Sequence, residues 1–252
     1  MIEATAVTGM VIASSPINEY DRRVVLLTKE RGKITAFARG ARRQYSPMLA
    51  STQLFAFGTF RVIEGRNAYT LTGAEITNYF EIIPRDPMKA CYGSYFLEMA
   101  GYYARENNNE VELLKLLYQT LRILCRDVVP YPLIRVIFEL RTFVVNGEYP
   151  EAFHCVICGS EEGLNHFSPV RSGILCDRCL AEGGTVLPLS PSALYAIKYI
   201  ITSPIERLYT FNVSPEVLHE LQKIMEGYIR RHIDRDFKSL EILDVMTNMG
   251  TF

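Results

Sequence analysis

Hydrophobic and polar residues alternate along residues 1–80 in short stretches rich in Val, Ile, Thr, Phe and Tyr, a pattern typical of β-strands. Turn residues separate the stretches, which predicts five strands: Ala4–Ala13, Arg22–Thr28, Lys33–Arg39, Leu54–Glu64 and Ala68–Asn78. The interval Gly40–Gln53 has room for a loop and a helical turn after Ser46-Pro47. Five strands with this insertion after the third predict a small closed barrel of OB type. A five-stranded SH3-like barrel is the alternative that the pattern leaves open.

The period of the pattern becomes helical after Pro84 and Pro87. It predicts six helices: Met88–Arg105, Glu110–Arg126, Leu133–Val145, Ser190–Thr202, Ser214–Arg231 and a short amphipathic one over Phe237–Met246. Residues 148–189 interrupt the helical pattern. We therefore expect an α+β multidomain protein. We expect residues 1–80 to form the OB-fold domain, and residues 81–252 to form an α-helical domain with an insertion at about 150–186.

Composition narrows the class of protein. Of 252 residues, 48% are hydrophobic and 22% are charged, which allows a sizeable core and excludes disorder over most of the length. The sequence has no apolar run of membrane-spanning length and no secretory signal, so we expect a cytoplasmic protein without a membrane partner. The net charge of −1 hides an asymmetry, because residues 1–80 hold ten Lys and Arg against six Asp and Glu.

Two Cys-x-x-Cys motifs, Cys155-Val-Ile-Cys158 and Cys176-Asp-Arg-Cys179, are separated by seventeen residues. This spacing is typical of a zinc ribbon, in which each tight turn presents two thiolates to a tetrahedral Zn²⁺. Cysteine at all four positions leaves no coordination position open, so the sequence predicts one structural zinc ion. A ribbon that has lost its metal is the alternative. We interpret His154 and His166 as surface residues of the ribbon, and His219 and His232 as solvent-facing helix residues.

Basic residues concentrate in residues 22–43, where Glu30 alone opposes eight Lys and Arg. In the third strand, alternation places Phe37 on the same face as Lys33 and Arg39. Cations that neutralise phosphates beside a ring that stacks on bases are what a single-stranded nucleic-acid groove requires. The predicted DNA-binding residues are Arg22, Arg23, Lys33, Phe37, Arg39, Arg42 and Arg43. The alternative is a solvated strand face with an ordinary surface phenylalanine.

Motifs of nucleotide hydrolysis, dinucleotide binding and acyl transfer are absent from the sequence, and no cluster of carboxylates or histidines predicts an active site. We therefore expect a binding protein rather than an enzyme. Lys115, Arg122 and Arg126 follow one side of their predicted helix, with leucines on the other side, some of them expected to stay accessible. The cations and the accessible leucines would form a groove with an apolar floor and a cationic rim. Such a groove suits a short peptide that is both acidic and hydrophobic. The alternative is that the cations only complement the C-terminal end of their own helix.

An ordered set of segments resembles the RecO family of recombination mediators: Asn18-Glu19-Tyr20-Asp21-Arg22, Leu27-Thr28-Lys29-Glu30-Arg31-Gly32-Lys33, Phe37-Ala38-Arg39-Gly40-Ala41-Arg42-Arg43, Leu71-Thr72-Gly73-Ala74-Glu75-Ile76, Asn146-Gly147-Glu148-Tyr149-Pro150 before the first cysteine motif, and Phe237-Lys238-Ser239. The resemblance covers essentially the whole chain. Arg39 stands where the family often has Lys, and Ser172-Gly173 where it often has Gly-Gly.

The resemblance implies an N-terminal OB-fold, a helical domain with a zinc ribbon, and DNA repair without ATP. Such proteins bind and anneal single-stranded DNA. With RecR, they help RecA displace single-stranded-DNA-binding protein, whose acidic C-terminal tail would occupy the groove of the helical domain. Two other interpretations remain open from the residues. One is a zinc-ribbon transcription or translation factor that binds duplex DNA or RNA, and the other is a nuclease.

Overall fold

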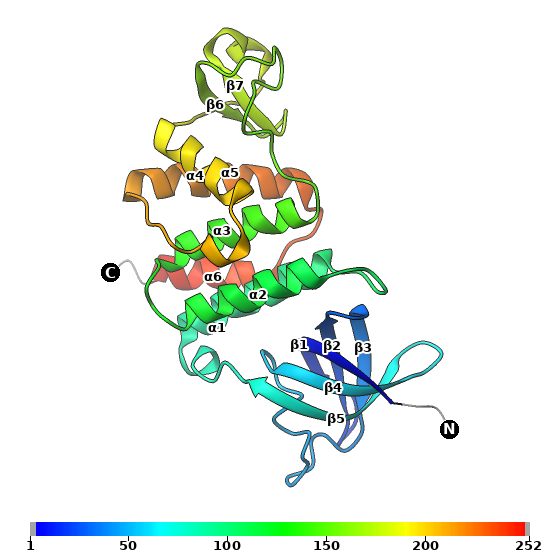
Figure 1. Ribbon diagram of the computed structural model, residues 1–252. Helices are drawn as coiled ribbons and strands as arrows, with labels where there is room; N and C mark the ends of the chain where they lie inside the picture. Colours follow the sequence, from blue (N-terminus) through cyan, green and yellow to red (C-terminus); the bar gives the residue numbers. More distant parts are fainter. Residues whose placement is uncertain (1–3, 250–252) are drawn as a thin grey trace. The chain divides into compact units, whose positions relative to one another are not determined.

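The computed structural model describes residues 4–249, and the chain divides into two compact units. One unit contains the described residues up to Cys125 together with those from Phe237 onward, and the other unit is Arg126–Asp236. Strands dominate the start of the first unit, and helices with a small ribbon make up the second (Figure 1). Between residues 4 and 249, no helix combines the length and the apolar character needed to cross a membrane.

Within the described residues, five strands of the first unit close into a barrel in the order β1-β2-β3-β5-β4. Strand β1 pairs antiparallel with both β2 and β4, and β3 pairs in parallel with β5. This is the OB arrangement, so the predicted OB-fold is confirmed and the SH3-like alternative is wrong. The strands are β1 (Thr5–Pro16), β2 (Arg22–Thr28), β3 (Gly32–Ala38), β4 (Phe57–Glu64) and β5 (Tyr69–Asn78).

Strand β1 pairs with two neighbouring strands because it is long and bent. Its first half pairs with β4, its second half pairs with β2, and a bulge between Val11 and Ala13 marks the bend. Gly9 lies where the two pairings overlap, opposite Thr28 on one side and Gly58 on the other. A Cβ at Gly9 would lie 2.5 Å from the carbonyl oxygen of Leu27, so this position requires glycine.

The connection between β3 and β4 is a series of turns rather than a helix. The amide of Leu49 donates to the carbonyl of Ser46, at the place where the sequence predicts a helical turn. Strand β4 begins at Phe57 instead of the predicted Leu54, because Phe55 has a φ of 71°, which a strand cannot continue through. The Phe55 side chain is buried.

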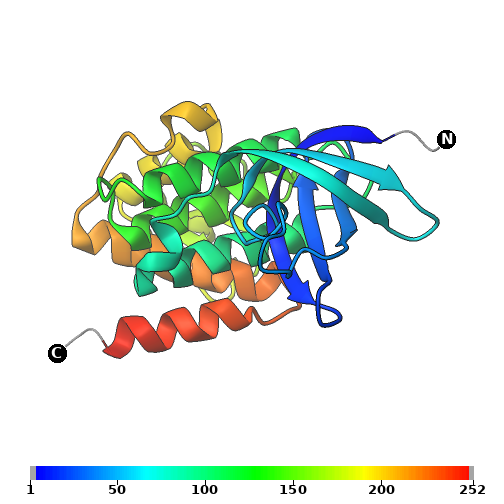
Figure 2. The ribbon, with the colours of Figure 1, turned by 90° about the horizontal axis from the view of Figure 1, so that it is seen from below.

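Helix α1 (Pro87–Tyr103) is apolar around most of its surface, and the side chain of Asp86 caps its first turn. Helix α6 (Lys238–Met249) packs on it in the same unit (Figure 2). The ring of Phe237 meets those of Tyr95 and Tyr102 edge-on, both at 5.8 Å between centroids. The amide of Ser239 also donates to the carboxylate of Glu98. These contacts fix the start of α6 against α1.

Lys33 ties the barrel to α1 within the first unit. Its amide donates to the carbonyl of Arg105 at 2.9 Å, and its side-chain amine donates to the carbonyl of Gly101 at 2.8 Å. Helix α2 (Val111–Leu124) follows α1, and its Tyr118 ring packs against Phe57 at the start of β4, with 4.5 Å between centroids. The barrel and these helices therefore share a core.

The second unit contains α3 (Tyr131–Val145), α4 (Pro191–Thr202) and α5 (Pro215–His232). The hydroxyls of Ser190 and Ser214 accept from backbone amides in the first turns of α4 and α5, as the two Ser-Pro pairs predict. Arg141 on α3 donates to the carbonyl of Ile201 at the end of α4, at 2.6 Å. This hydrogen bond fastens two helices of the unit together.

The ribbon of the second unit is an antiparallel sheet of β6 (Leu164–Ser168), β7 (Gly173–Cys176) and β8 (Leu187–Pro188). Tyr228 on α5 anchors it to the helices. Its ring packs against Phe167 of β6 at 6.2 Å and edge-on against Phe143 of α3 at 4.9 Å. The ring also stacks on His232 at 4.1 Å, and the hydroxyl donates to the carbonyl of Glu148.

His232 is not solvent-facing, which corrects the interpretation from the sequence. Its Nε2 lies 3.0 Å from the hydroxyl of Ser172, in the turn between β6 and β7. Burial lowers the pKa of His232. Helical periodicity could not show that the ribbon folds back over this end of α5.

Candidate nucleic-acid interface and metal centre

The four cysteines of the two Cys-x-x-Cys motifs come together in the ribbon. Their sulfur atoms all lie within 4.8 Å of one another, which is close enough for one metal ion. Cys155 and Cys158 belong to a tight turn, in which the amide of Gly159 donates to the carbonyl of Cys155 and Gly159 has a φ of 72°. Cys176 ends β7, and Cys179 lies in the short 3-10 helix Asp177–Glu182 that follows.

The surroundings favour the thiolate form at two of the sulfurs, those of Cys155 and Cys176. Burial raises the pKa of the Cys155 thiol, but hydrogen bonds from the amides of Cys158, Cys176 and Ile157 outweigh it and bring the pKa down to about 6. The pKa of Cys176 is also lowered, against its burial, by hydrogen bonds from Cys158 and Cys179. Burial and the neighbouring sulfurs raise the pKa of Cys179. Four thiolates so close together repel one another, so this donor set fits a cation that compensates their charge.

The histidines of the ribbon are not part of the sulfur cluster. His154 is exposed and lies between the carboxylates of Glu151 and Glu161, at 3.6 and 3.4 Å. His166 contacts Asp177 at 3.0 Å, beside the second cysteine motif. Asp177 also accepts two hydrogen bonds from Asn165. The histidines thus support the turns that carry the cysteines.

The outer face of β3 carries Phe37, and Arg39 follows directly after the strand, which ends one residue earlier than predicted; both side chains are exposed, as the sequence predicts. The residues that alternate with them, Ile34, Ala36 and Ala38, are buried in the barrel core. Arg23 on β2 is directly opposite Phe37 in the antiparallel pair, and it is also exposed. Arg23 and Phe37 are therefore cross-strand neighbours on one face.

Arg42 and Arg43 join this face through contacts between two loops. The amide of Gly40 donates to Asp21 at 2.8 Å, which lowers the pKa of that carboxyl, and the amide of Arg42 donates to the carbonyl of Tyr20 at 2.9 Å. The guanidinium of Arg43 lies 5.3 Å from the centre of the Tyr20 ring, a cation–π distance. The loop before β2 and the loop after β3 therefore form one surface.

Arg22 and Lys33 are half-buried and held by protein partners, whereas Arg42 stays exposed although its guanidinium donates to the carbonyl of Asn18 at 2.9 Å. The guanidinium of Arg22 donates to the hydroxyl of Thr52 at 3.2 Å, and burial lowers its pKa. The amine of Lys33 is hydrogen-bonded to Gly101 of α1. We call the remaining residues, with Tyr20 and Tyr45, the barrel face: Tyr20, Arg23, Phe37, Arg39, Arg42, Arg43 and Tyr45.

Tyr20 is a residue of the barrel face that the predicted set omits. Tyr20 is 44% exposed and lies beside Arg43. Phe37 is 39% exposed, and Tyr45, two residues after Arg43 in the chain, is 91% exposed. The sequence did contain a signal for Tyr45, which follows Arg42 and Arg43 closely. Tyr20 lies in a loop that contains two acidic residues, so only the fold brings it beside the cations.

The predicted cations of the helical domain do not form one row. Lys115 is exposed, Arg122 is half-buried and donates to Gln119 at 3.1 Å, and Arg126 lies past the end of α2 in the other compact unit. The expectation of accessible leucines along α2 is wrong, because all of them are buried: Leu113, Leu114, Leu116, Leu117, Leu121 and Leu124. This helix therefore offers cations but no apolar floor.

Comparisons with known proteins place these features in a family. Residues 1–80 match the family model described as Recombination protein O N terminal, and residues 84–241 match Recombination protein O C terminal. A DNA repair protein RecO of Symbiobacterium thermophilum is 35% identical over 245 residues, which is 95% of this chain and 96% of that protein. The protein of that name from Acetivibrio thermocellus is 31% identical over 241 residues, with 95% and 96% covered.

The chain belongs to the RecO family. The resemblance seen in the sequence is therefore confirmed. A RecO relative from Halalkalibacterium halodurans, 31% identical over 242 residues, covers 96% of this chain and 95% of its own length. The match runs through the barrel, the helices and the ribbon, so the barrel face and the cysteine cluster both belong to a RecO framework.

Proposed function

We propose that this protein is a DNA repair and recombination mediator that binds and anneals single-stranded DNA. With RecR, it helps to load RecA onto strands coated by single-stranded-DNA-binding protein. Membership of the RecO family supports the mediator over a zinc-ribbon transcription or translation factor and over a nuclease. In this proposal residues 1–80 carry DNA binding. Residues 81–252, with the ribbon at about 150–186, carry partner binding and the metal, and the protein acts in the bacterial cytoplasm at the nucleoid.

The observation that carries the proposal is the juxtaposition of exposed rings and cations on the barrel face. Arginines neutralise phosphates whatever the sequence, and the rings of Phe37 and Tyr20 give bases a surface on which to stack. Neither contact reads base identity, so the binding suits a protein that must accept any strand. Release of counterions from about four phosphates predicts a slope near −3 for log K against log salt.

Annealing without ATP is the experiment that tests this function. Two complementary labelled strands should pair faster with the wild-type protein, with no ATP present and no cleavage when Mg²⁺ is added. The triple variant Arg39→Glu, Arg42→Glu, Arg43→Glu should lose this acceleration. A matched control, Arg207→Glu, Lys223→Glu, Arg231→Glu, makes the same charge change at exposed residues of the other unit. Equal annealing by the two triple variants would refute the placement of DNA on the barrel face.

We propose that Cys155, Cys158, Cys176 and Cys179 hold one structural Zn²⁺. The support is the donor set, because four sulfurs within 4.8 Å match a closed thiolate site. When bound, zinc supplies the positive charge that lets all four thiols lose their protons. The chain's own part is to hold the two turns at the right separation, through the amides around Cys155 and through the contacts of Asp177.

We also propose that the acidic C-terminal tail of single-stranded-DNA-binding protein contacts Lys115, Arg122 and Arg126. The support is their positive charge and the exposure of Lys115 and Arg126, without the apolar floor expected from the sequence. Calorimetry with the tail peptide tests this placement. The double variant Arg122→Glu, Arg126→Glu should no longer bind the tail peptide and should keep its affinity for naked single strands. Wild-type affinity for the tail in this variant would place the tail elsewhere.

A further inference from the structure

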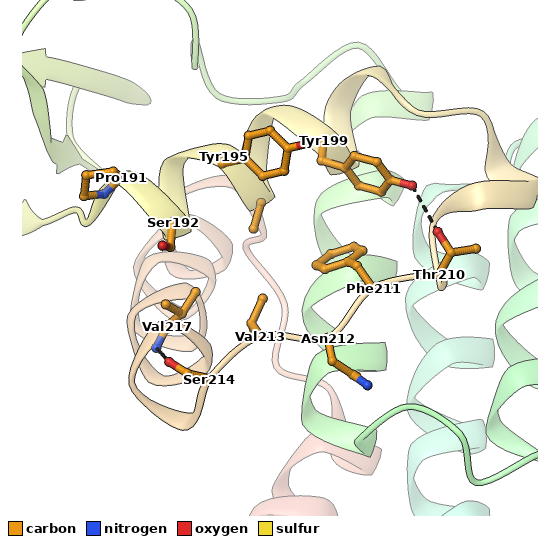
Figure 3. A pocket seen from close by; sticks show the side chains of 11 residues that line it. Pro191, Ser192, Tyr195, Tyr199, Thr210, Phe211, Asn212, Val213, Ser214 and Val217 are labelled. Carbon is orange, nitrogen blue, oxygen red and sulfur yellow. Dashed lines mark hydrogen bonds between the residues drawn. The ribbon is translucent and has the colours of Figure 1, made fainter.

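A groove of about 600 Å³ lies in the second unit, between α4 and the start of α5 (Figure 3). Tyr195 and Tyr199 of α4 line one side, and Val217 of α5 lines the other. The segment before α5 adds Phe211 and Val213. None of these residues belongs to the barrel face or to the cysteine cluster, so the groove serves neither site described above.

The aromatic wall of the groove is held in place. The rings of Tyr195 and Tyr199 stack at 6.4 Å with 26° between their planes, and Phe211 meets Tyr199 edge-on at 5.1 Å. The hydroxyl of Tyr199 lies 3.1 Å from that of Thr210, which fixes this ring (Figure 3). At 71%, Tyr195 is the most exposed large hydrophobic residue among the described residues of the second unit. An apolar ligand could therefore bury Tyr195 without rearranging the wall.

The electrostatics of the groove disfavour an anion. No Lys, Arg, Asp or Glu is among its described lining residues. The helix N-termini beside it are each capped by a serine, since the hydroxyl of Ser190 accepts from Ala193 and that of Ser214 accepts from Val217. Glu220 also accepts from the amide of Ser190 at 2.9 Å. Exposed Glu216 is hydrogen-bonded to Ser214, which lowers its pKa and keeps it ionised. Glu216 and Glu220 thus place negative charge at the end of the groove where the two helices begin.

We propose that this groove binds a short segment of a partner protein that carries a large apolar side chain flanked by lysine or arginine. The apolar side chain lies against Tyr195 and Val213, and the cations of the segment lie near Glu216 and Glu220. From Pro191 to Tyr199, helix α4 spans about 12 Å, the length of roughly four extended residues. A nucleic acid is disfavoured because no Lys or Arg among the described lining residues would meet its phosphates, and an acidic peptide because it would meet two carboxylates.

Peptide binding to the full-length protein tests the proposal. The probe is a fluorescein-labelled peptide with Leu-Phe at its centre and two lysines on each side. Two reference peptides replace the lysines with glutamates or the Leu-Phe with Ser-Ser. Fluorescence anisotropy at low salt should show the lysine peptide binding at least about fivefold more tightly than either reference.

Two variants assign the binding to the groove. Tyr195→Ser should weaken the lysine peptide about tenfold, and Glu216→Lys should reduce the preference for lysine over glutamate. Tyr149→Ser, at an exposed tyrosine of the same unit outside the groove, is the matched control and should bind like wild type. Both test positions are exposed, and circular dichroism would verify that the variants fold.

Several outcomes would overturn the proposal. They are equal or tighter binding of the glutamate peptide, displacement of the lysine peptide by oligo-dT, wild-type binding by Tyr195→Ser, or no binding of the lysine peptide at about 1 mM. The annealing experiment addresses different residues in the other unit. Loss of the proposed DNA function would therefore leave this inference standing, and the reverse also holds.

Discussion

Arg22 and Arg23 are adjacent in the chain, yet their guanidinium groups have different surroundings. Arg22 is hydrogen-bonded to Thr52 in the turn before β4, so a phosphate would have to compete with the protein for it. Arg23 is exposed and directly opposite Phe37. A desolvated, hydrogen-bonded arginine stabilises the fold, and an exposed one is available to a ligand. We therefore propose that Arg23 contacts phosphate, whereas Arg22 holds the turn that contains Thr52.

Phe37→Ala should weaken single-strand binding by about 1–3 kcal/mol, because a stacked base would lose its ring. Fluorescence anisotropy with labelled oligo-dT measures the change. Tyr79→Ala, which removes another exposed ring of the same unit, is the control and should bind like wild type. Equal affinities of the two variants would show that no base stacks on Phe37.

His232 should make the second unit less stable in mild acid. Burial lowers its pKa from 6.5, with Arg231 acting in the same direction and Glu148 in the opposite one. The unfolded chain therefore binds the proton more tightly, so stability is full above pH 6.5 and is lost as the pH falls through the folded-state pKa.

The measurement is urea unfolding between pH 7.5 and pH 5, followed by far-ultraviolet circular dichroism. His232→Gln should flatten the decline below pH 6.5, whereas His219→Gln, at an exposed position, should leave it unchanged. Parallel pH profiles for wild type and His232→Gln would contradict this assignment.

At the scale of elements, the strands and helices could largely be predicted from periodicity. The two Ser-Pro pairs predicted the starts of α4 and α5, because serine caps a helix and proline suits its first position. The start of β4 was missed because the positive φ of Phe55 has no sequence signal. The burial of every leucine on α2 was missed because a helical wheel gives direction but no neighbours.

In the candidate sites too, features set by local sequence could be predicted, and features set by long-range contacts could not. The cysteine cluster could be predicted because its spacing encodes two local turns. The outward direction of Phe37 and Arg39 followed from the two-residue period of a strand. The partners of Arg22 and Lys33, and the approach of Arg43 to Tyr20, depend on long-range contacts that no local pattern contains.

Gly9→Ala should destabilise the barrel by about 1–3 kcal/mol, because the new methyl group would lie against the Leu27 carbonyl, where both neighbours of β1 meet it. Urea unfolding measures the free energy. The control is Gly101→Ala in α1, where a Cβ would make an ordinary 3.5 Å contact with Ile12. This variant should be neutral or stabilising by up to about 1 kcal/mol. A harmless Gly9→Ala would mean that β1 can shift away from β2.

At the scale of the whole molecule, the cysteine cluster and the barrel face belong to different compact units. Chelation, or Cys155→Ser, should lower the melting temperature of the second unit, because the ribbon lacks a core large enough to fold alone. Elemental analysis of protein purified without chelator should find about one zinc per chain.

Single-strand affinity measured on the same samples should change less than about twofold, because no cysteine of the cluster belongs to the unit that contains the barrel. Cys91→Ser, at a cysteine outside the cluster, is the control for loss of a thiol. A metal-free protein with an unchanged melting temperature would contradict the structural role.

The parallel contact between β3 and β5 has a further consequence. It consists of Ala36 opposite Tyr69 and Phe37 opposite Thr70, whereas β2 and β3 pair along seven positions. This seam is therefore where the closed barrel should open first in local fluctuations. A bound strand stacked on Phe37 lies over the seam and would hold it shut. We expect amide hydrogen exchange at Phe37 and Thr70 to be faster than in the rest of the barrel, and to slow when oligo-dT binds.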